Sequence, residues 1–242
     1  MTPARLGVVI PARDEEQLLP RCLVSVAAAA AIVEETGRHV SVVLVLDSCT
    51  DGSTAAAAGT AAELGLELHL LETSAGNVGS ARAEGVAYAL ELNAEWIANT
   101  DADTVVPGNW LRTQTELAEA GYGLVLGTVV PDARDLRSGH LALWQDRHVL
   151  AEGHPYIHGA NLEFSARAYR AGGGFLPGVS HEDVELVERI KAAGLSWVAT
   201  DWIRAVTSGR RDGRAWTPAR TRMKPKFGPS EKSRDTGSSV RP

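Results

Sequence analysis

Short apolar runs alternate with longer amphipathic stretches along the first half of the chain. Runs such as 6–10 and 40–46 are typical of buried strands, because each spans a few residues and ends at a proline or an acidic residue. The stretches between them carry apolar residues at helical spacing. This alternation predicts an α/β fold with a mostly parallel central sheet flanked by helices on both faces. The further predicted strands are 66–71, 96–98 and 124–130, and the predicted helices follow Asp14–Glu16 and cover 54–64, 80–92 and 107–120.

The pattern is less regular after Pro131. Beyond about Thr217, Lys, Pro, Ser and Gly follow one another without periodicity, which predicts a basic, disordered tail over 217–242. The elements expected between these points are helices over 141–150 and 183–193 and strands over 160–164, 197–199 and 203–206.

Charge is unevenly distributed along the chain. Residues 1–203 hold 13 basic and 27 acidic groups, whereas residues 204–242 hold 11 basic and 3 acidic groups. A basic end can meet phosphates or an anionic lipid surface, or it can simply be solvated, and these alternatives stay open. We expect no nucleic-acid partner.

Neither a secretion signal nor a membrane span is evident in the sequence. No charged-then-apolar segment opens the chain, and the longest apolar run, 24–33, is much shorter than the roughly 20 residues of a membrane span. Cys22 and Cys49 have neither metal-type nor disulfide-type spacing, which favours a reducing compartment. We therefore expect a cytoplasmic protein without an integral membrane segment, for which peripheral membrane contact through the basic tail stays open.

Two carboxylates follow the fourth predicted strand, in Asp101-Ala102-Asp103. Ligands bind at the carboxyl ends of strands in open α/β sheets. Carboxylate oxygens suit Mg²⁺ and Mn²⁺, which usually share their coordination sphere with substrate phosphates. The triplet therefore indicates a divalent-metal site for a diphosphate, and the alternative is a solvated loop that precedes the helix at Pro107.

Polar residues also follow the second and third predicted strands. Asp47 could accept the N3–H of a uracil, while Asp51 caps the next helix, although both could be simple turn-formers. Asn77, Gly79 and Arg82 lie where a helix begins and could form an anion site for phosphate. Arg82 could equally pair with a structural acid on a neighbouring loop.

Three further groups of polar residues come later in the chain. Glu182-Asp183 precede an amphipathic helix, either as acids that suit a helix N-terminus or with one of them as a general base. Arg210 and Arg211, with Arg214, could close over a diphosphate or could be surface charge. The three histidines His154, His158 and His181 show no zinc-like arrangement.

The series of motifs resembles the family 2 glycosyltransferases, which have the GT-A fold. No Gln-x-x-Arg-Trp element of processive synthases is present. The matching segments are Pro11–Glu16 with "IPxxNEE" (Asp14 replaces the usual Asn), Val45–Ser53 with "VDDGSTDGT", Asn77–Arg82 with "NxGxxxARN", Asp101–Asp103 with the metal motif, Gly159–Asn161 and Gly173–Phe175 with "GxN…GGF", and Glu182–Leu186 with "EDxDL".

By this resemblance, one GT-A domain covers 1–216, with a nucleotide-sugar half at 1–106 and an acceptor half at 107–216. Asp103 is expected to be the main ligand of Mn²⁺ or Mg²⁺, with Asp101 the weaker one, and Asp183 the catalytic base. The expected substrate-binding residues are Pro11, Arg13, Glu15, Asp47, Asn77, Arg82, Asp101, Ala102, Asn161, Glu182, Arg210 and Arg211.

The resemblance implies a metal-dependent, inverting and non-processive transfer of a sugar from a nucleotide-diphosphate donor to a hydroxyl acceptor. A UDP-sugar is the favoured donor. Two other classes stay open. A sugar-phosphate nucleotidyltransferase would carry a Gly-rich loop after the first strand, and Pro11–Glu16 has no glycine. A non-catalytic nucleotide-sugar-binding module would bind nucleotide without turnover.

Overall fold

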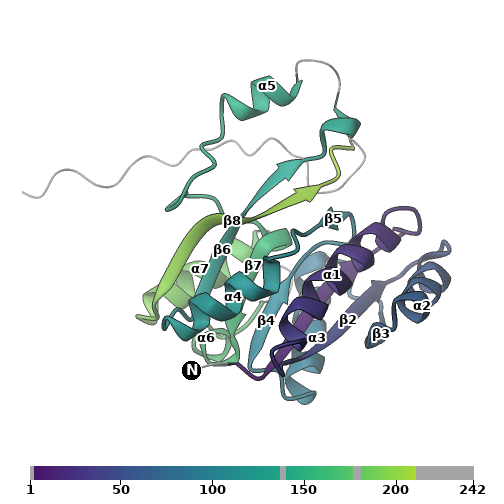
Figure 1. The fold of residues 1–242 in the computed structure, drawn as a ribbon, viewed down its shortest axis with the longest axis horizontal. Helices are drawn as coiled ribbons and strands as arrows, with labels where there is room; N and C mark the ends of the chain where they lie inside the picture. Colours follow the sequence, from purple (N-terminus) through teal and green to yellow (C-terminus); the bar gives the residue numbers. More distant parts are fainter. Residues whose placement is uncertain (1–2, 137–139, 177–180, 211–242) are drawn as a thin grey trace, which may run out of the picture. The chain divides into compact units, whose positions relative to one another are not determined.

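Eight strands form one mixed sheet in the order β3-β2-β1-β4-β7-β6-β8-β5 (Figure 1). This computed structural model describes residues 3–136, 140–176 and 181–210. The strands are β1 (Arg5–Ala12), β2 (His39–Asp47), β3 (Leu68–Thr73), β4 (Trp96–Asn99), β5 (Thr104–Val105), β6 (Leu124–Pro131), β7 (Leu162–Ser165) and β8 (Trp197–Thr207).

The first four strands of this order are parallel, as the alternating pattern predicts. β1 pairs in parallel with both β2 and β4, and β2 pairs in parallel with β3. β7 then lies antiparallel between β4 and β6, while β8 runs parallel to β6. The α/β class with a mostly parallel sheet is confirmed, and the reversal at β7 joins the two halves of the sheet.

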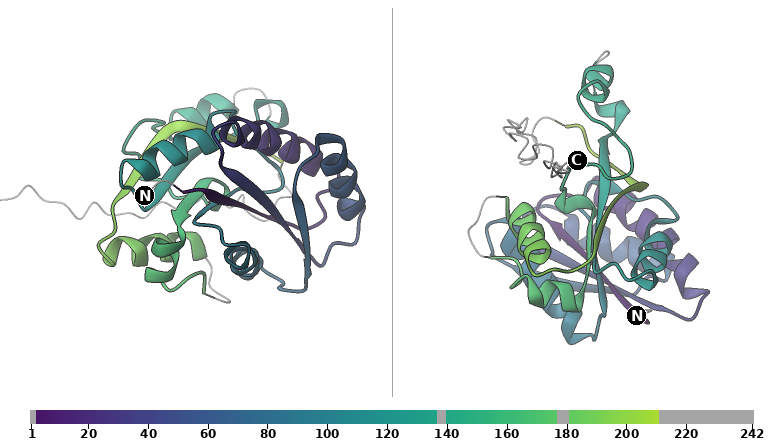
Figure 2. Two further views of the ribbon diagram at one scale, coloured as in Figure 1. Left: turned by 60° about the horizontal axis from the view of Figure 1, so that its bottom comes forward. Right: turned by 90° about the vertical axis from the view of Figure 1, so that its left-hand side faces the viewer.

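Helices cover both faces of the sheet, and each face has its own hydrophobic core (Figure 2). The sequence produces this arrangement because the sheet's central residues are apolar on both sides, as at Val42 and Val43, which are fully buried in opposite cores. The helices of one face are α1 (Leu19–Glu34), α2 (Ser53–Leu64) and α4 (Trp110–Glu119), and those of the other are α3 (Val78–Glu91), α6 (Ala166–Ala171) and α7 (Glu182–Ala192).

Several predicted boundaries need correction. The helix expected from Pro107 begins at Trp110, because Pro107 to Asn109 form a turn in which the Trp110 N–H donates to the Pro107 carbonyl. The helix expected over 141–150 is α5 (His140–Gln145). The two short strands expected at 197–199 and 203–206 are one strand, β8.

The sequence predicts two strands in place of β8 because polar and exposed residues occupy the middle of β8. Thr200 and Asp201 bind the Glu152 carboxylate through a hydroxyl and a backbone N–H, and Trp202 is 65% exposed. The backbone nevertheless remains paired with β6 on both sides of an irregularity near Gly127.

The compact unit ends at Gly209, and residues from Arg210 onward form a separate unit. The tail predicted over 217–242 and the last residues of the predicted domain lie outside the described residues. No helix in the described part of the chain has both the length and the apolar character needed to cross a membrane.

Candidate active site

A buried arginine joins two carboxylates that are far apart in the sequence. Arg82, on the first turns of α3, directs Nη2 to Asp101 Oδ1 and Nη1 to Glu182 Oε1, each at 2.6 Å. Arg82 is 4% exposed. Burial opposes its charge, but the Asp101 and Glu182 carboxylates outweigh burial and raise the pKa of the guanidinium. Of the two roles that the sequence left open for Arg82, the structure therefore shows pairing with acids.

Two motif glycines make room for this cluster. A Cβ at Gly159 would lie 2.4–2.6 Å from three atoms of the Arg82 guanidinium. A Cβ at Gly79 would lie 2.8 Å from Glu182 Cγ. Any larger residue at either position would overlap the cluster, so the glycines of the "NxG" and "GxN" segments serve packing around Arg82.

Asp183 lies beside this cluster and differs from its neighbour Glu182. Its Oδ2 accepts a hydrogen bond from the Gly159 N–H at 2.9 Å, and Oδ1 accepts from the Val184 N–H at 2.8 Å. Glu182 is buried and occupied by Arg82, whereas Asp183 is partly exposed. Spacing alone left the two acids equivalent, and accessibility now favours Asp183 as the group that a substrate can reach.

Asp103 lies in the same loop after β4 as Asp101, but it contacts the end of β8, whereas Asp101 contacts Arg82. Ala102 is buried between the two aspartates. The Thr207 hydroxyl at the end of β8 donates to Asp103 Oδ1 at 3.1 Å, and the Ser208 N–H donates to the Asp103 carbonyl. These contacts fix the loop, and Thr207 is a positioning residue that the sequence motifs did not indicate.

The residues present fit a divalent cation that prefers oxygen ligands. Asp101 and Asp103 are both partly exposed carboxylates on one short loop. Oδ1 of Asp101 is engaged by Arg82, whereas Oδ1 of Asp103 accepts hydrogen bonds from the Thr104 and Thr207 hydroxyls. Such a donor set suits Mg²⁺ or Mn²⁺.

Asp47 is placed at the end of β2 and tied to the loop after β3. Its Oδ1 accepts from the Gly76 N–H at 3.0 Å and from the Ser48 hydroxyl at 3.2 Å. Ser48 has a φ of 55°, in the left-handed region, so the chain turns immediately after Asp47. Asn77, next to Gly76, caps α3 by accepting from the Ser80 N–H at 2.8 Å.

Acidic side chains of the loop after β1 accept hydrogen bonds from the loop after β2. Asp14 Oδ1 accepts from the Thr50 N–H at 2.7 Å, and this bond lowers the pKa of Asp14. Glu16 Oε2 accepts from the Gly52 N–H at 2.7 Å. The acids of the "IPxxNEE"-like segment therefore hold the edge of the site in shape. Of the residues expected here to bind substrate, Pro11 is buried, and Arg13 and Glu15 are partly exposed.

Asn161 is an exception among the expected substrate-binding residues, because its side chain is fully buried. Its amide donates to the Thr128 and Ile203 carbonyls at 2.8 and 2.7 Å, and its oxygen accepts from the Trp110 indole at 2.9 Å. Both amide N–H groups are thus used inside the protein, so Asn161 holds β6, β8 and α4 together. This geometry contradicts a direct side-chain contact with substrate.

Of the two arginines expected to close over a diphosphate, the structure describes only Arg210, which is partly exposed. Arg210 begins the separate C-terminal unit, and Arg211 lies outside the described residues.

A series of neighbouring aromatic and imidazole rings extends from α5 to His158. Trp144 of α5 stacks on His148 with ring centroids 4.0 Å apart, His148 contacts Tyr156 at 5.4 Å, and Tyr156 contacts His158 at 6.1 Å. His158 precedes Gly159, and burial lowers the pKa of its imidazole to about 4 despite the nearby Asp183 charge. The His158 imidazole is therefore neutral near pH 7. It directly precedes Gly159, whose N–H binds Asp183.

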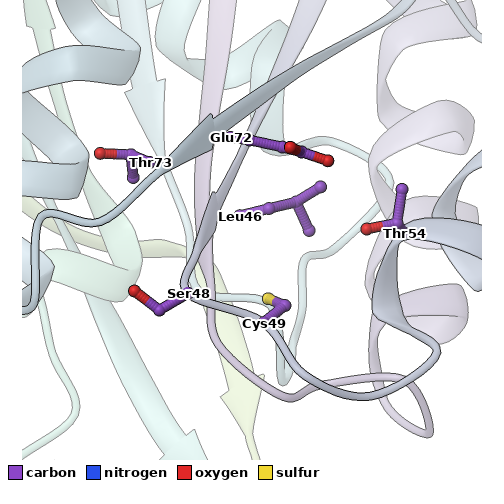
Figure 3. A pocket seen from close by; sticks show the side chains of 6 residues that line it. All are labelled: Leu46, Ser48, Cys49, Thr54, Glu72 and Thr73. Atoms are coloured by element: carbon purple, nitrogen blue, oxygen red, sulfur yellow. The ribbon is translucent and has the colours of Figure 1, made fainter.

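A small pocket lies at the ends of β2 and β3 (Figure 3). Its volume is about 150 Å³, and it is lined by Leu46, Ser48, Cys49, Thr54, Glu72 and Thr73. Ligand pockets usually span roughly 300–1,000 Å³, so this one is too small for a nucleoside diphosphate. Its lining includes neither Asp47 nor the acids around Arg82, although Ser48, which lines it, donates its hydroxyl to Asp47.

Comparison with known proteins identifies a family and similar folds. The profile of the family described as Glycosyl transferase family 2 matches residues 7–174. The mannosyltransferase PcManGT from Pyrobaculum calidifontis, solved with GDP-Man and Mn²⁺, is similar at 23% identity and a TM-score of 0.65, over 88% of this chain and 59% of that one. TarS 1–349 from S. aureus, solved with UDP-GlcNAc, is similar at 16% identity and a TM-score of 0.65, over 86% and 59%.

At these identities the likeness concerns the fold alone, and it confirms the expected GT-A architecture. The chain spans about three fifths of the length of these solved chains. No curated protein sequence matches the chain.

Proposed function

Because the chain belongs to glycosyl transferase family 2, we propose that it transfers a sugar from a nucleotide-diphosphate donor to a hydroxyl acceptor in a metal-dependent, inverting and non-processive reaction. The observation that carries this proposal is the meeting of the Asp101–Asp103 loop and the start of α7 around Arg82, at the carboxyl ends of the parallel strands.

In the proposed reaction, Asp183 removes the proton of an acceptor hydroxyl while the acceptor oxygen bonds to the anomeric carbon. The bond between that carbon and the diphosphate oxygen breaks, and the nucleoside diphosphate leaves. Attack opposite the leaving group inverts the configuration. When bound at Asp103 and Asp101, Mn²⁺ or Mg²⁺ supplies positive charge that offsets the charge developing on the diphosphate.

The donor would lie along the strand ends of the predicted nucleotide-sugar half. Asp47, at the end of β2, would accept the N3–H of a uracil, so UDP is the nucleotide that we propose. Pro11 and Ala102 are buried, so they would offer backbone groups, whereas Arg13 and Glu15 could offer side chains. Among the similar structures, TarS was solved with UDP-GlcNAc and PcManGT with GDP-Man and Mn²⁺, so both uracil and guanine donors need testing.

A thermal-shift panel tests the donor. UDP, GDP, dTDP and CDP sugars are each added with Mn²⁺, with Mg²⁺ or with a chelator. A ligand that binds only the folded state stabilises it more the tighter it binds, with the logarithm of its affinity. We expect the largest shift with a UDP-sugar and Mn²⁺, and a smaller one with chelator. Stabilisation without release of UDP would instead favour a non-catalytic binding module, and absence of any shift would contradict the proposal.

A further inference from the structure

We propose that Arg82 is a positioning residue, which couples the metal-binding loop after β4 to the catalytic start of α7 and does not bind the donor's diphosphate. This inference rests on the proposed function, because it names the residue that sets the relative positions of Asp101 and Asp183.

Both terminal nitrogens of the guanidinium already bind a carboxylate. Nη1 and Nη2 are each bound to a carboxylate at 2.6 Å, and Nε is buried without a hydrogen-bond partner among the described residues. The guanidinium keeps further N–H groups, but a diphosphate would have to reach them on a side chain that is only 4% exposed. An arginine that binds phosphate normally presents its planar fork to the ligand.

The space around Arg82 is shaped for this position of the guanidinium. Gly159 leaves room for the guanidinium itself, and Gly79 leaves room for the Glu182 chain that binds it. The same Gly159 donates its N–H to Asp183. One short segment therefore contacts both the arginine and the proposed base, so a shift of the arginine would be transmitted to the base.

The positive charge of Arg82 holds two carboxylates, those of Asp101 and Glu182, close together. Asp101 and Glu182 both contact one cation, and Asp183 follows Glu182 at the start of α7. Without that cation, the Asp101 and Glu182 carboxylates would lose their shared partner and repel each other. This repulsion would move Asp183 and the Asp101 loop relative to each other. The pairing also occupies Asp101 Oδ1.

The test compares Arg82→Gln and Arg82→Lys with the wild-type chain, and uses Arg167→Gln as a control because Arg167 is an exposed arginine on α6. Binding of UDP is measured by calorimetry with and without Mn²⁺. UDP release from the donor selected by the thermal-shift panel gives kcat and KM. Since a misplacement of about 1 Å can slow catalysis about 100-fold, Arg82→Gln should lower kcat by about that factor at saturating donor.

Metal-free binding of UDP should be unchanged in Arg82→Gln. Lysine can reach one carboxylate but not both, so Arg82→Lys should recover part of kcat. Glu182→Gln also removes the ion pair between Arg82 and Glu182, and it should lower kcat without weakening UDP binding.

Three results would overturn the inference. Weaker UDP binding with unchanged kcat would make Arg82 a phosphate ligand. Wild-type kcat in the folded fraction of Arg82→Gln, or in Glu182→Gln if Arg82→Gln does not fold, would leave Arg82 only a role in stability. Failure of the wild-type chain to release a nucleoside diphosphate from any donor of the panel would instead contradict the proposed function.

Discussion

Glu163 is expected to make the stability of this protein depend on pH in a way that one substitution removes. It lies in β7, in the middle of the sheet, opposite Ala98 of β4 and Val125 of β6. The residue is 0% exposed, and neither carboxylate oxygen has a hydrogen-bond partner among the described residues. Burial raises the pKa of Glu163 well above its usual value of 4.5, opposed only by the nearby Trp110 indole.

The sign of the effect follows from where the proton is bound. Above pH 4.5 the unfolded chain loses the Glu163 proton, while the folded chain keeps it because its pKa is raised. Folding then requires proton uptake, so the free energy of unfolding falls as pH rises, by about 1.4 kcal/mol for each pH unit in this interval. The decline stops where pH reaches the raised pKa of the folded state.

Glu163→Gln has nearly the same shape and cannot ionise. Urea unfolding of both proteins at several pH values between about 5 and 8 should show the variant gaining on the wild type as pH rises, with a slope approaching 1.4 kcal/mol per unit. Glu84→Gln on an exposed position of α3 is the control and should give parallel curves. A difference between Glu163→Gln and wild type that stays the same at low and high pH would refute the reasoning.

Two other predictions concern the site. Gly159→Ala should destabilise the protein, because its Cβ would overlap the Arg82 guanidinium. The expected loss is about 2–4 kcal/mol, between the effects of overpacking and of breaking a buried ion pair. Urea unfolding measures this loss, and a neutral result would contradict the packing role. Gly59→Ala, in α2 with nothing within 4 Å of the added Cβ, is the control and should be neutral or stabilising by up to about 1 kcal/mol. Asp103→Asn should weaken Mn²⁺ binding at least about 10- to 100-fold, as judged from losses that follow outer-shell changes, and more than Asp101→Asn does; equal losses by calorimetry would contradict the ranking.

The sequence predicts the parallel part of the sheet well because its signal is local. Each apolar run ends in a polar cluster, and parallel strands bring those ends to one edge, so Asp47 and the Asp101–Asp103 loop can be placed without coordinates. β7 is less predictable, since the run 160–164 says nothing about its direction. That direction depends on pairing with β4 and β6, which are distant in the chain.

The contacts within the site are harder to predict, because a residue type does not reveal its partner. Arg82 and Glu182 are 100 positions apart, and the sequence left phosphate binding and acid pairing equally open for Arg82. Asn161 belongs to a motif that resembles a functional one, yet its amide is fully used inside the protein. The roles of Gly79 and Gly159 became visible only through the atoms that a side chain there would meet.

The most direct test of the proposed chemistry is the turnover of Asp183→Asn. The donor is the nucleotide sugar that stabilises the wild-type chain most in the presence of Mn²⁺, and release of the nucleoside diphosphate is followed at saturating donor. Loss of a general base should lower kcat by about 10²- to 10⁴-fold, while calorimetry should show unchanged metal-dependent binding of the nucleotide. Turnover at the wild-type rate in a folded Asp183→Asn variant would contradict the assignment of Asp183 as the catalytic base.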